Sequence, residues 1–307
     1  MSSRSPSPDE ELLRSLLAVQ FPRWATLSVS ALDDSAASDH ALFRLGDGLV
    51  ARLPRRPSAA QQVDKEQRWL PFLAERLSVP IPTVAARGRP AGDYPWPWSI
   101  YEWLPGRPAA ADAELDPGFG DDLARFIAEL HAVVAARGPD PGAHNGHRGA
   151  ALATRADEVE GALAALDEVP DLGLDLERAR RVWADALDAS AHDGPPRWIH
   201  GDLLPGNVLL DDHARLHAVI DFGCLGVGDP ACDVMAAWTI LPAEQRGAFR
   251  ARLEVDDDTW RRGRGWAVSF GLIALPYHRQ RTPALAAVAH QAIRASTSPS
   301  IADDLLF

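Results

Sequence analysis

Cysteine and lysine are the scarcest reactive side chains in this 307-residue sequence. The two cysteines, Cys224 and Cys232, are too few for a disulfide framework and lack the four-ligand spacing of a zinc site. We therefore expect both to be small buried residues. Lys65 is the only lysine, so arginine must supply nearly all of the positive charge at any site that binds an anion.

Long apolar runs and an excess of positive charge are also missing. No segment reaches the ~18 consecutive apolar residues of a membrane span, and residues 1–10 lack the apolar core of a signal peptide. The 31 basic and 43 acidic residues give a formal net charge of −12, which disfavours a nucleic-acid-binding surface. We predict a cytoplasmic protein without membrane or nucleic-acid partners. The negative charge would suit a cationic substrate, although solubility alone also explains it.

The length and composition favour two packed lobes around a cleft. The sequence is 46% hydrophobic and 24% charged, as in ordinary globular proteins, and single cores stop growing near ~250–300 residues. Short apolar segments separated by turn residues predict an antiparallel sheet in the first third of the chain. The predicted strands are residues 27–32, 41–45, 49–53, 83–87 and 98–104.

Two segments carry helix-start signals. Ser7 is a predicted N-cap, with Pro8 in the first turn and Glu10 completing a capping box, and this helix is expected to end near residue 20. Ser58 and Gln61 form a second predicted capping box, which opens a helix towards residue 77.

A change of composition near Pro105 predicts the boundary between the lobes, which we place at residues 1–105 and 106–307. Beyond it, apolar residues recur at helical spacing over residues 119–134 and predict a buried helix. His131 lies near the apolar face of this helix. A packed histidine is favoured there over a catalytic one, because no other feature recruits its ring.

The segment from residue 198 to residue 223 carries the chemistry. Residues 207–210 and 215–220 are predicted to pair as a hairpin, which brings Asn207 and Asp221 to the same open end. Asp202 lies five residues before Asn207 in the adjoining loop. Two carboxylates and an amide are therefore expected to converge.

These side chains suit phosphoryl transfer, which depends on positioning and charge neutralisation. Asp221 would chelate Mg²⁺, Asn207 would offer its carbonyl oxygen to the metal, and Asp202 would accept the proton of the attacking hydroxyl. The spacing matches the kinase loop H-R-D-x-x-x-x-N followed by D-F-G, with Gly201 in place of the arginine. The alternative is an ordinary turn and strand end, which the ordered pair of motifs disfavours.

The motifs H-G-D-x-x-x-x-N and I-D-F-G resemble the signature of the aminoglycoside phosphotransferase family, within the protein-kinase-like superfamily. Residues 228–233 resemble the family's G-D-P-x-x-D helix start. The resemblance implies that Asp233 braces the catalytic loop, and we expect the ring of His200 to brace it as well. A first-turn carboxylate that complements a helix dipole is a compatible interpretation of Asp233.

This resemblance implies a bilobal α+β fold of the protein-kinase-like type. A small antiparallel β-sheet would form the N-terminal nucleotide-binding lobe, and a larger, mainly helical C-terminal lobe would hold the catalytic and substrate-binding residues. The implied donor is ATP or GTP with Mg²⁺. The implied acceptor is a hydroxyl of a small molecule, with an aminoglycoside or related antibiotic as the leading expectation and antibiotic resistance as the corresponding role.

The N-terminal lobe departs from the family pattern. Arg52 stands where the family has the lysine that anchors the α- and β-phosphates, and Glu66 is its expected partner. A solvent-exposed strand arginine is the alternative. No glycine-rich phosphate loop is present, and Ser38 is a candidate phosphate contact in the corresponding turn.

The hinge is expected to bind the purine through the main chain of Glu102, Trp103 and Leu104, so their identity leaves ATP and GTP open. Two other functions stay open at this stage. One is a metabolic kinase acting on choline, a sugar or a similar hydroxyl compound. The other is a catalytically silent nucleotide-binding regulatory module, which the unusual Arg52 permits.

Overall fold

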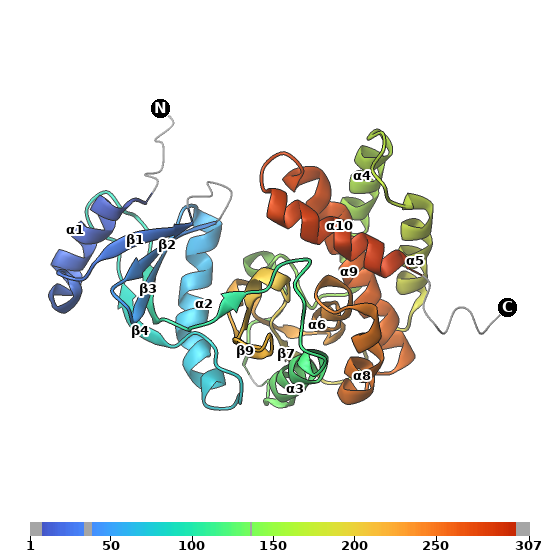
Figure 1. The fold of residues 1–307 in the computed structure, drawn as a ribbon, viewed down its shortest axis with the longest axis horizontal. Coiled ribbons are helices and arrows are strands. Elements are labelled where there is room, and N and C mark those ends of the chain that lie inside the picture. The colour runs from blue at the N-terminus through green and yellow to red at the C-terminus, as the bar shows by residue number, and fades with distance from the viewer. Residues whose placement is uncertain (1–7, 34–38, 136, 299–307) are drawn as a thin grey trace.

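The structure is a computed structural model that describes residues 8–33, 39–135 and 137–298. A sheet with two helices forms one end of the molecule and a mainly helical body forms the other (Figure 1). The elements of the first end are α1 (Glu10–Gln20), η1 (Pro22–Trp24), β1 (Val29–Asp33), β2 (His40–Leu45), β3 (Leu49–Pro54), α2 (Pro57–Ala74), β4 (Val84–Gly88) and β5 (Trp98–Glu102).

Within the described residues, the sheet has the antiparallel order β1-β2-β3-β5-β4, and the predicted strands are therefore confirmed with small shifts at their ends. Gly46 has a φ of 52° and turns the chain between β2 and β3, where a residue with a side chain would be strained. The register pairs Leu42 with Arg52, which fixes the position of Arg52 on the central strand β3. A small apolar core that includes Leu13 and Trp98 joins α1 to this sheet.

Both predicted capping boxes failed. Helix α1 begins at Glu10, and the Asp9 side chain accepts a 2.8 Å hydrogen bond from the backbone N–H of Leu12; Ser7 lies outside the described residues. Helix α2 has Arg56 as its N-cap without a side-chain cap, and it ends at residue 74 instead of residue 77. Ser58 does not cap α2 because the helix already begins at Pro57, whose fixed φ suits the first helical position.

The second part of the chain wraps helices around two small sheets. Strands β6 (Arg107–Pro108), β8 (Val208–Leu210) and β9 (Leu216–Val219) form one sheet, and β10 (Gly226–Gly228) pairs with β7 (Arg197–Ile199) in the other. The elements are β6 (Arg107–Pro108), α3 (Phe119–Ala132), η2 (Ala143–Asn145), η3 (Leu152–Arg155), α4 (Ala156–Asp167), α5 (Leu176–Asp188), β7 (Arg197–Ile199), η4 (Pro205–Asn207), β8 (Val208–Leu210), β9 (Leu216–Val219), η5 (Phe222–Cys224), β10 (Gly226–Gly228), α6 (Ala231–Val234), α7 (Ala236–Thr239), α8 (Ala243–Leu253), α9 (Asp257–His278) and α10 (Pro283–Thr297).

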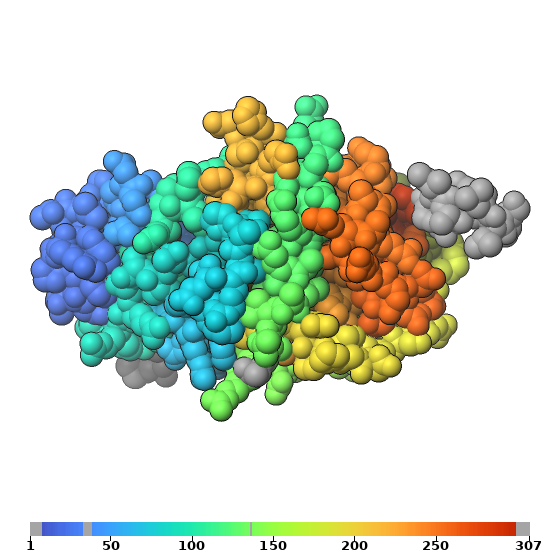
Figure 2. Space-filling view, turned by 90° about the horizontal axis from the view of Figure 1, so that it is seen from below, coloured from blue at the N-terminus to red at the C-terminus, as the bar shows by residue number. Residues whose placement is uncertain are grey.

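A larger apolar core fills this second part and includes the fully buried Phe126, Trp198 and Trp266. It also takes in Leu70 and Leu73 from α2, so α2 packs against both parts of the molecule. The space-filling view shows the N-terminal elements at one end and the C-terminal helices at the other, with the segment around α3 between them (Figure 2). Among the described residues, no helix combines the length and apolarity that a membrane crossing requires.

Candidate active site

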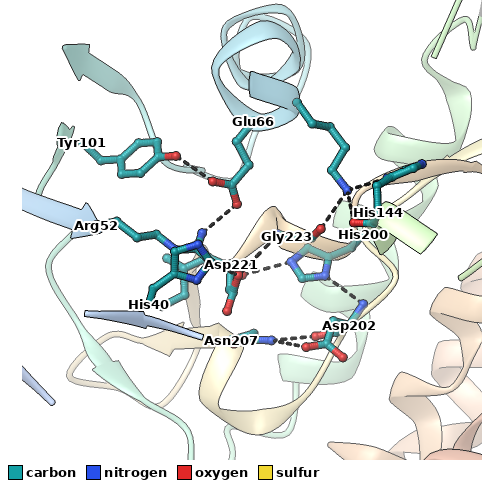
Figure 3. A network of polar contacts seen from close by, with 12 residues as sticks. His40, Arg52, Glu66, Tyr101, His144, His200, Asp202, Asn207, Asp221 and Gly223 are labelled. Atoms are coloured by element: carbon teal, nitrogen blue, oxygen red, sulfur yellow. Dashed lines mark hydrogen bonds and ion pairs between the residues drawn. The ribbon is translucent and has the colours of Figure 1, made fainter. Parts of the chain in front are cut away.

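The β8–β9 hairpin positions the first two candidate residues. The strands pair in antiparallel register, and the backbone N–H of Ile220 donates to the carbonyl oxygen of Asn207 at 2.9 Å. Asn207 ends η4 just before β8, and Asp221 follows β9 by two residues. The predicted convergence at the open end of the hairpin is therefore observed (Figure 3).

A buried carboxylate holds the loop that carries Asp202. The two oxygens of Asp233 accept hydrogen bonds from the backbone N–H groups of His200 and Gly201, at 2.9 Å and 2.8 Å. Asp233 has no exposed surface, so these charge-assisted bonds are shielded from water. His131 lies beside them, with Nε2 3.3 Å from Asp233 Oδ2. The bracing geometry expected for Asp233 is present.

The ring of His200 ties the same loop to the end of β9. Its Nδ1 accepts from the backbone N–H of Asp202 at 3.2 Å, and its Nε2 lies 3.0 Å from the carbonyl oxygen of Ile220. Because Nδ1 accepts and the Ile220 oxygen also accepts, the ring must carry its proton on Nε2. The imidazole therefore connects the loop to the end of β9 through both of its ring nitrogens.

Asn207 contacts both ends of Asp202. Its side-chain N–H group donates to the carbonyl oxygen of Asp202 at 2.8 Å and to Oδ2 of its carboxylate at 3.2 Å. This leaves the amide oxygen of Asn207 available for another ligand. Asp202 is a quarter exposed, and its carboxylate borders the cleft.

Arg52 joins the other side of the cleft to Asp221. Its Nη1 donates to Glu66 Oε1 at 2.7 Å and its Nη2 to Asp221 Oδ1 at 2.6 Å. Glu66 in turn accepts from the hydroxyl of Tyr101 at 2.7 Å, and His40 Nδ1 lies 3.3 Å from Arg52 Nη2 (Figure 3). The Arg52 side chain is only 13% exposed, so the alternative of a solvent-exposed strand arginine is wrong.

The surroundings shift the pKa values of Asp221 and Asp202 in opposite directions. Desolvation in the cleft would by itself raise the pKa of Asp221, but the charge of Arg52, helped by His40, lowers that pKa to about 2. Desolvation raises the pKa of Asp202, against the opposing charge of Arg148. Asp221 is therefore held ionised for a cation, whereas Asp202 is the better proton acceptor.

Lys65, the neighbour of Glu66 on α2, was assigned no role from the sequence. Its Nζ donates to the carbonyl oxygen of Gly223 at 2.8 Å and to that of His144 at 3.3 Å. Burial lowers the pKa of Lys65 to about 8. This lysine links α2 to the turn after Asp221 and to the segment around His144.

The remaining predicted nucleotide contacts differ in what is observed. Ser38 lies outside the described residues. The backbone N–H groups of Glu102 and Trp103 donate to the carbonyl oxygens of Thr83 and Gly48, at 2.9 Å and 2.8 Å. A purine at this hinge would therefore have to use carbonyl groups or Leu104.

A cavity of about 1130 Å³ opens beside the candidate residues. Asp202, Asn207 and Asp221 are among the residues that line it. Helix α10 and residues 109–112 provide other walls, with side chains such as Leu285 and Arg294. Its volume is slightly above the roughly 300–1,000 Å³ of typical small-molecule sites, so a small-molecule acceptor fits.

The donor atoms near Asp221 fit Mg²⁺. Among the described residues, no three His, Cys, Asp or Glu side chains form a metal-binding group. The carboxylate of Asp221 and the amide oxygen of Asn207 are hard oxygen donors, and Mg²⁺ is commonly held by one or two protein ligands together with phosphates. The pair therefore matches a nucleotide-bound Mg²⁺ better than a site made wholly of protein ligands.

Comparison with known proteins identifies the class. A model of the phosphotransferase enzyme family matches residues 29–266. The chain therefore belongs to that family. An aminoglycoside 3'-phosphotransferase from Streptomyces fradiae is 31% identical over 218 residues, covering 67% of this chain and 71% of that protein. A viomycin phosphotransferase from Streptomyces vinaceus is 33% identical over 199 residues, covering 62% of this chain and 67% of that protein.

A solved structure supports the fold assignment. The GDP complex of wild-type aminoglycoside 2'-phosphotransferase-IIIa superimposes with a TM-score of 0.69 at 20% sequence identity. The superposition covers 94% of this chain and 99% of that one. The bilobal kinase-like α+β fold expected from the sequence is thereby confirmed.

Proposed function

We propose that the protein transfers the γ-phosphoryl group of ATP or GTP to a hydroxyl group of a small molecule, with Asp202 as the general base. One observation carries this proposal: Asp202, Asn207 and Asp221 all line one cavity that is large enough for an acceptor. Family membership supports the reaction type. The braced loop supports Asp202 as the base, because a base must be held at a fixed position relative to the attacking hydroxyl.

In this mechanism the acceptor oxygen forms a bond to the γ-phosphorus while the bond to the bridging oxygen of the nucleotide breaks. The hydroxyl proton passes to the carboxylate of Asp202, and the nucleoside diphosphate leaves. The hydrogen bond from Asn207 to Oδ2 orients that carboxylate. His200 and Asp233 act on the backbone of the loop instead of on the substrate.

Asp221 and Asn207 would hold Mg²⁺, which when bound neutralises charge on the phosphates. Arg52 would contact the phosphates from β3, and Glu66 would fix the orientation of its guanidinium. When a nucleotide binds, Arg52 would exchange its contact with Asp221 for phosphate oxygens. Ser38 and the hinge residues Glu102, Trp103 and Leu104 stay proposed contacts of the donor.

The names of the relatives make an aminoglycoside or related cationic antibiotic the first acceptor class. A metabolite with fewer charges is the second. The described residues that line the cavity beyond the catalytic set include one carboxylate, Asp112, together with Arg246 and Arg294. A compound with several ammonium groups would be expected to need more carboxylates than this part of the wall provides.

A coupled nucleotide-turnover assay tests the proposal. The purified protein would be supplied with Mg²⁺ and ATP or GTP, across a panel of aminoglycosides, macrolides, choline and sugars. We expect one compound class to stimulate turnover and to yield a phosphorylated product by mass spectrometry, with Asp202→Ala as the inactive control. Nucleotide binding without Asp202-dependent turnover would instead favour the regulatory module.

A further inference from the structure

Arg148 reaches Asp202 from a segment outside the catalytic motifs. Its Nη2 lies 3.5 Å from Oδ1 of Asp202, and its side chain is 13% exposed. We propose that Arg148 is a positioning residue that holds the Asp202 carboxylate in the orientation needed to accept the hydroxyl proton. This inference rests on the proposed function, because it assigns Asp202 the role of base.

The segment that carries Arg148 is anchored to the catalytic core on both sides. The backbone N–H of Val227 in β10 donates to the carbonyl oxygen of Pro139 at 2.8 Å. That of Asp229 donates to the carbonyl oxygen of Gly149 at 2.8 Å. The side chain of Asn145, which is almost fully buried, donates to the carbonyl oxygen of Arg148 at 3.1 Å. The backbone from which Arg148 projects is therefore fixed relative to the loop.

Gly201 leaves the space in which Arg148 approaches the base. Its φ is 80°, and an added Cβ would lie 3.1 Å from Cβ of Arg148 and 2.6 Å from the carbonyl oxygen of Cys224. Any larger residue would be strained and would press on both neighbours. Glycine thus stands where the kinase loop has arginine, and an arginine from a distant segment comes to lie against the loop.

Arg148 and Asn207 hold different oxygens of the same carboxylate. Arg148 faces Oδ1, whereas the side chain of Asn207 donates to Oδ2 at 3.2 Å. Contacts on both oxygens restrict rotation of the carboxylate in a way that neither contact achieves alone. A small misorientation of a catalytic group can cost up to about 100-fold in rate.

The guanidinium of Arg148 lies beside Asp202 and the thiol of Cys224, but its hydrogen bonding is incomplete. Within the described part of the chain, its Nη1 is buried without a hydrogen-bond partner. Arg262 shows the contrast: it is also buried, but its guanidinium bonds both oxygens of Asp229 and the hydroxyl of Thr259. Burying an arginine with incomplete bonding costs stability. Its placement next to the base accounts for that arrangement better than packing does.

The test compares Arg148→Met and Arg148→Lys with Arg155→Met. Arg155 is a matched control, because its guanidinium is also buried near the Trp266 ring but bonds Ser269 instead of the base. Turnover of Mg²⁺–ATP would be measured with water and with kanamycin as acceptors, since Asp202 would take the proton from either. Nucleotide affinity and thermal stability would be measured on the same samples.

We expect Arg148→Met to lower turnover roughly 10- to 100-fold while nucleotide affinity changes less than about twofold. Arg148→Lys should recover part of the loss, and in an Asp202→Asn background Arg148→Met should have no further effect. If the turnover losses of Arg148→Met and Asp202→Asn multiply in the double variant, the inference is overturned. Parental turnover of Arg148→Met would also overturn it. An equal turnover loss in Arg155→Met would do the same. If Arg148→Met fails to fold, Arg148→Lys would replace it in the same comparison with Asp202→Asn.

Failure of the proposed function would give a different kinetic result from failure of the Arg148 inference alone. If Asp202→Asn turned over ATP as fast as the parent, that result would contradict both the proposed function and this inference. Turnover that depends on Asp202 but ignores Arg148 would overturn the inference alone.

Discussion

Asp233, which lies behind the loop that carries Asp202, and Asp221, which borders the cleft, are held by different kinds of partner. Asp233 is fully buried and accepts from two backbone N–H groups of the catalytic loop. The side chain of Asp221 is 45% exposed, and its ion-pair partner is the long side chain of Arg52. Backbone donors are fixed by the fold, whereas a side-chain ion pair can open when ligands arrive. The proposed base is therefore prearranged, and the proposed metal ligand is free to change partners.

Substitution of Asp202, the proposed base, should have the largest effect on turnover. We expect Asp202→Ala to keep the fold and nearly normal nucleotide affinity but to lose about 10²- to 10⁴-fold in turnover, because the residue contacts the acceptor hydroxyl. Steady-state kinetics with a confirmed acceptor, alongside thermal melts, would measure this. Turnover within about threefold of the parent would remove Asp202 from the mechanism.

The bracing of the loop can be broken at Asp233. Asp233→Asn replaces one accepting oxygen with an N–H group that faces a buried backbone donor, so we expect a loss on the order of 3 kcal/mol in unfolding free energy. Turnover should fall with it. Urea unfolding would measure the loss. Asp211→Asn is the matched control, since Asp211 also accepts from two backbone N–H groups but lies in an exposed turn. An equal loss in both variants would show that burial of the Asp233 carboxylate does not strengthen its hold on the loop.

On the other side of the cleft, Arg52 should respond to charge more than to shape. We expect Arg52→Ala to weaken nucleotide binding roughly 10- to 100-fold, because a charged hydrogen bond to the phosphates is lost. Arg52→Lys should retain most of the affinity. Calorimetric titration with a nonhydrolysable ATP analogue would compare the two. Parental affinity of the alanine variant would exclude a phosphate contact.

Lys65 should give the smallest effect, and one that depends on pH. Burial lowers its pKa to about 8 in the folded protein, against a usual value of 10.5. Between these values the unfolded chain binds more protons, so the contribution of Lys65 to stability rises with pH. We therefore expect the parent to gain stability relative to Lys65→Met from about pH 8 to about pH 10.5. Parallel stability curves for the two proteins would show that the ammonium group is not desolvated.

The sequence predicted the strands, the hairpin and the contacts that belong to motifs, but it missed partners that belong to no motif and misplaced both helix starts. The hairpin that joins Asn207 to Asp221 follows from strand alternation and a short turn, both of which are local. Arg148 and Tyr101 belong to no motif, and only the folded chain brings them to Asp202 and Glu66. The capping box at Ser58 failed because Pro57, next to it, starts the helix earlier.

The most direct test of the proposed metal site is Mg²⁺-dependent nucleotide binding at Asp221. Calorimetric titration of a nonhydrolysable ATP analogue, with and without Mg²⁺, would compare the parent with Asp221→Ala and Asn207→Ala. If Asp221 and Asn207 hold the metal, the parent will bind the analogue more tightly with Mg²⁺ than without it. Asp221→Ala should lose that gain and Asn207→Ala only part of it, because a carboxylate neutralises the metal while an amide completes its shell. Equal Mg²⁺-dependent affinity of Asp221→Ala and the parent would contradict the metal assignment.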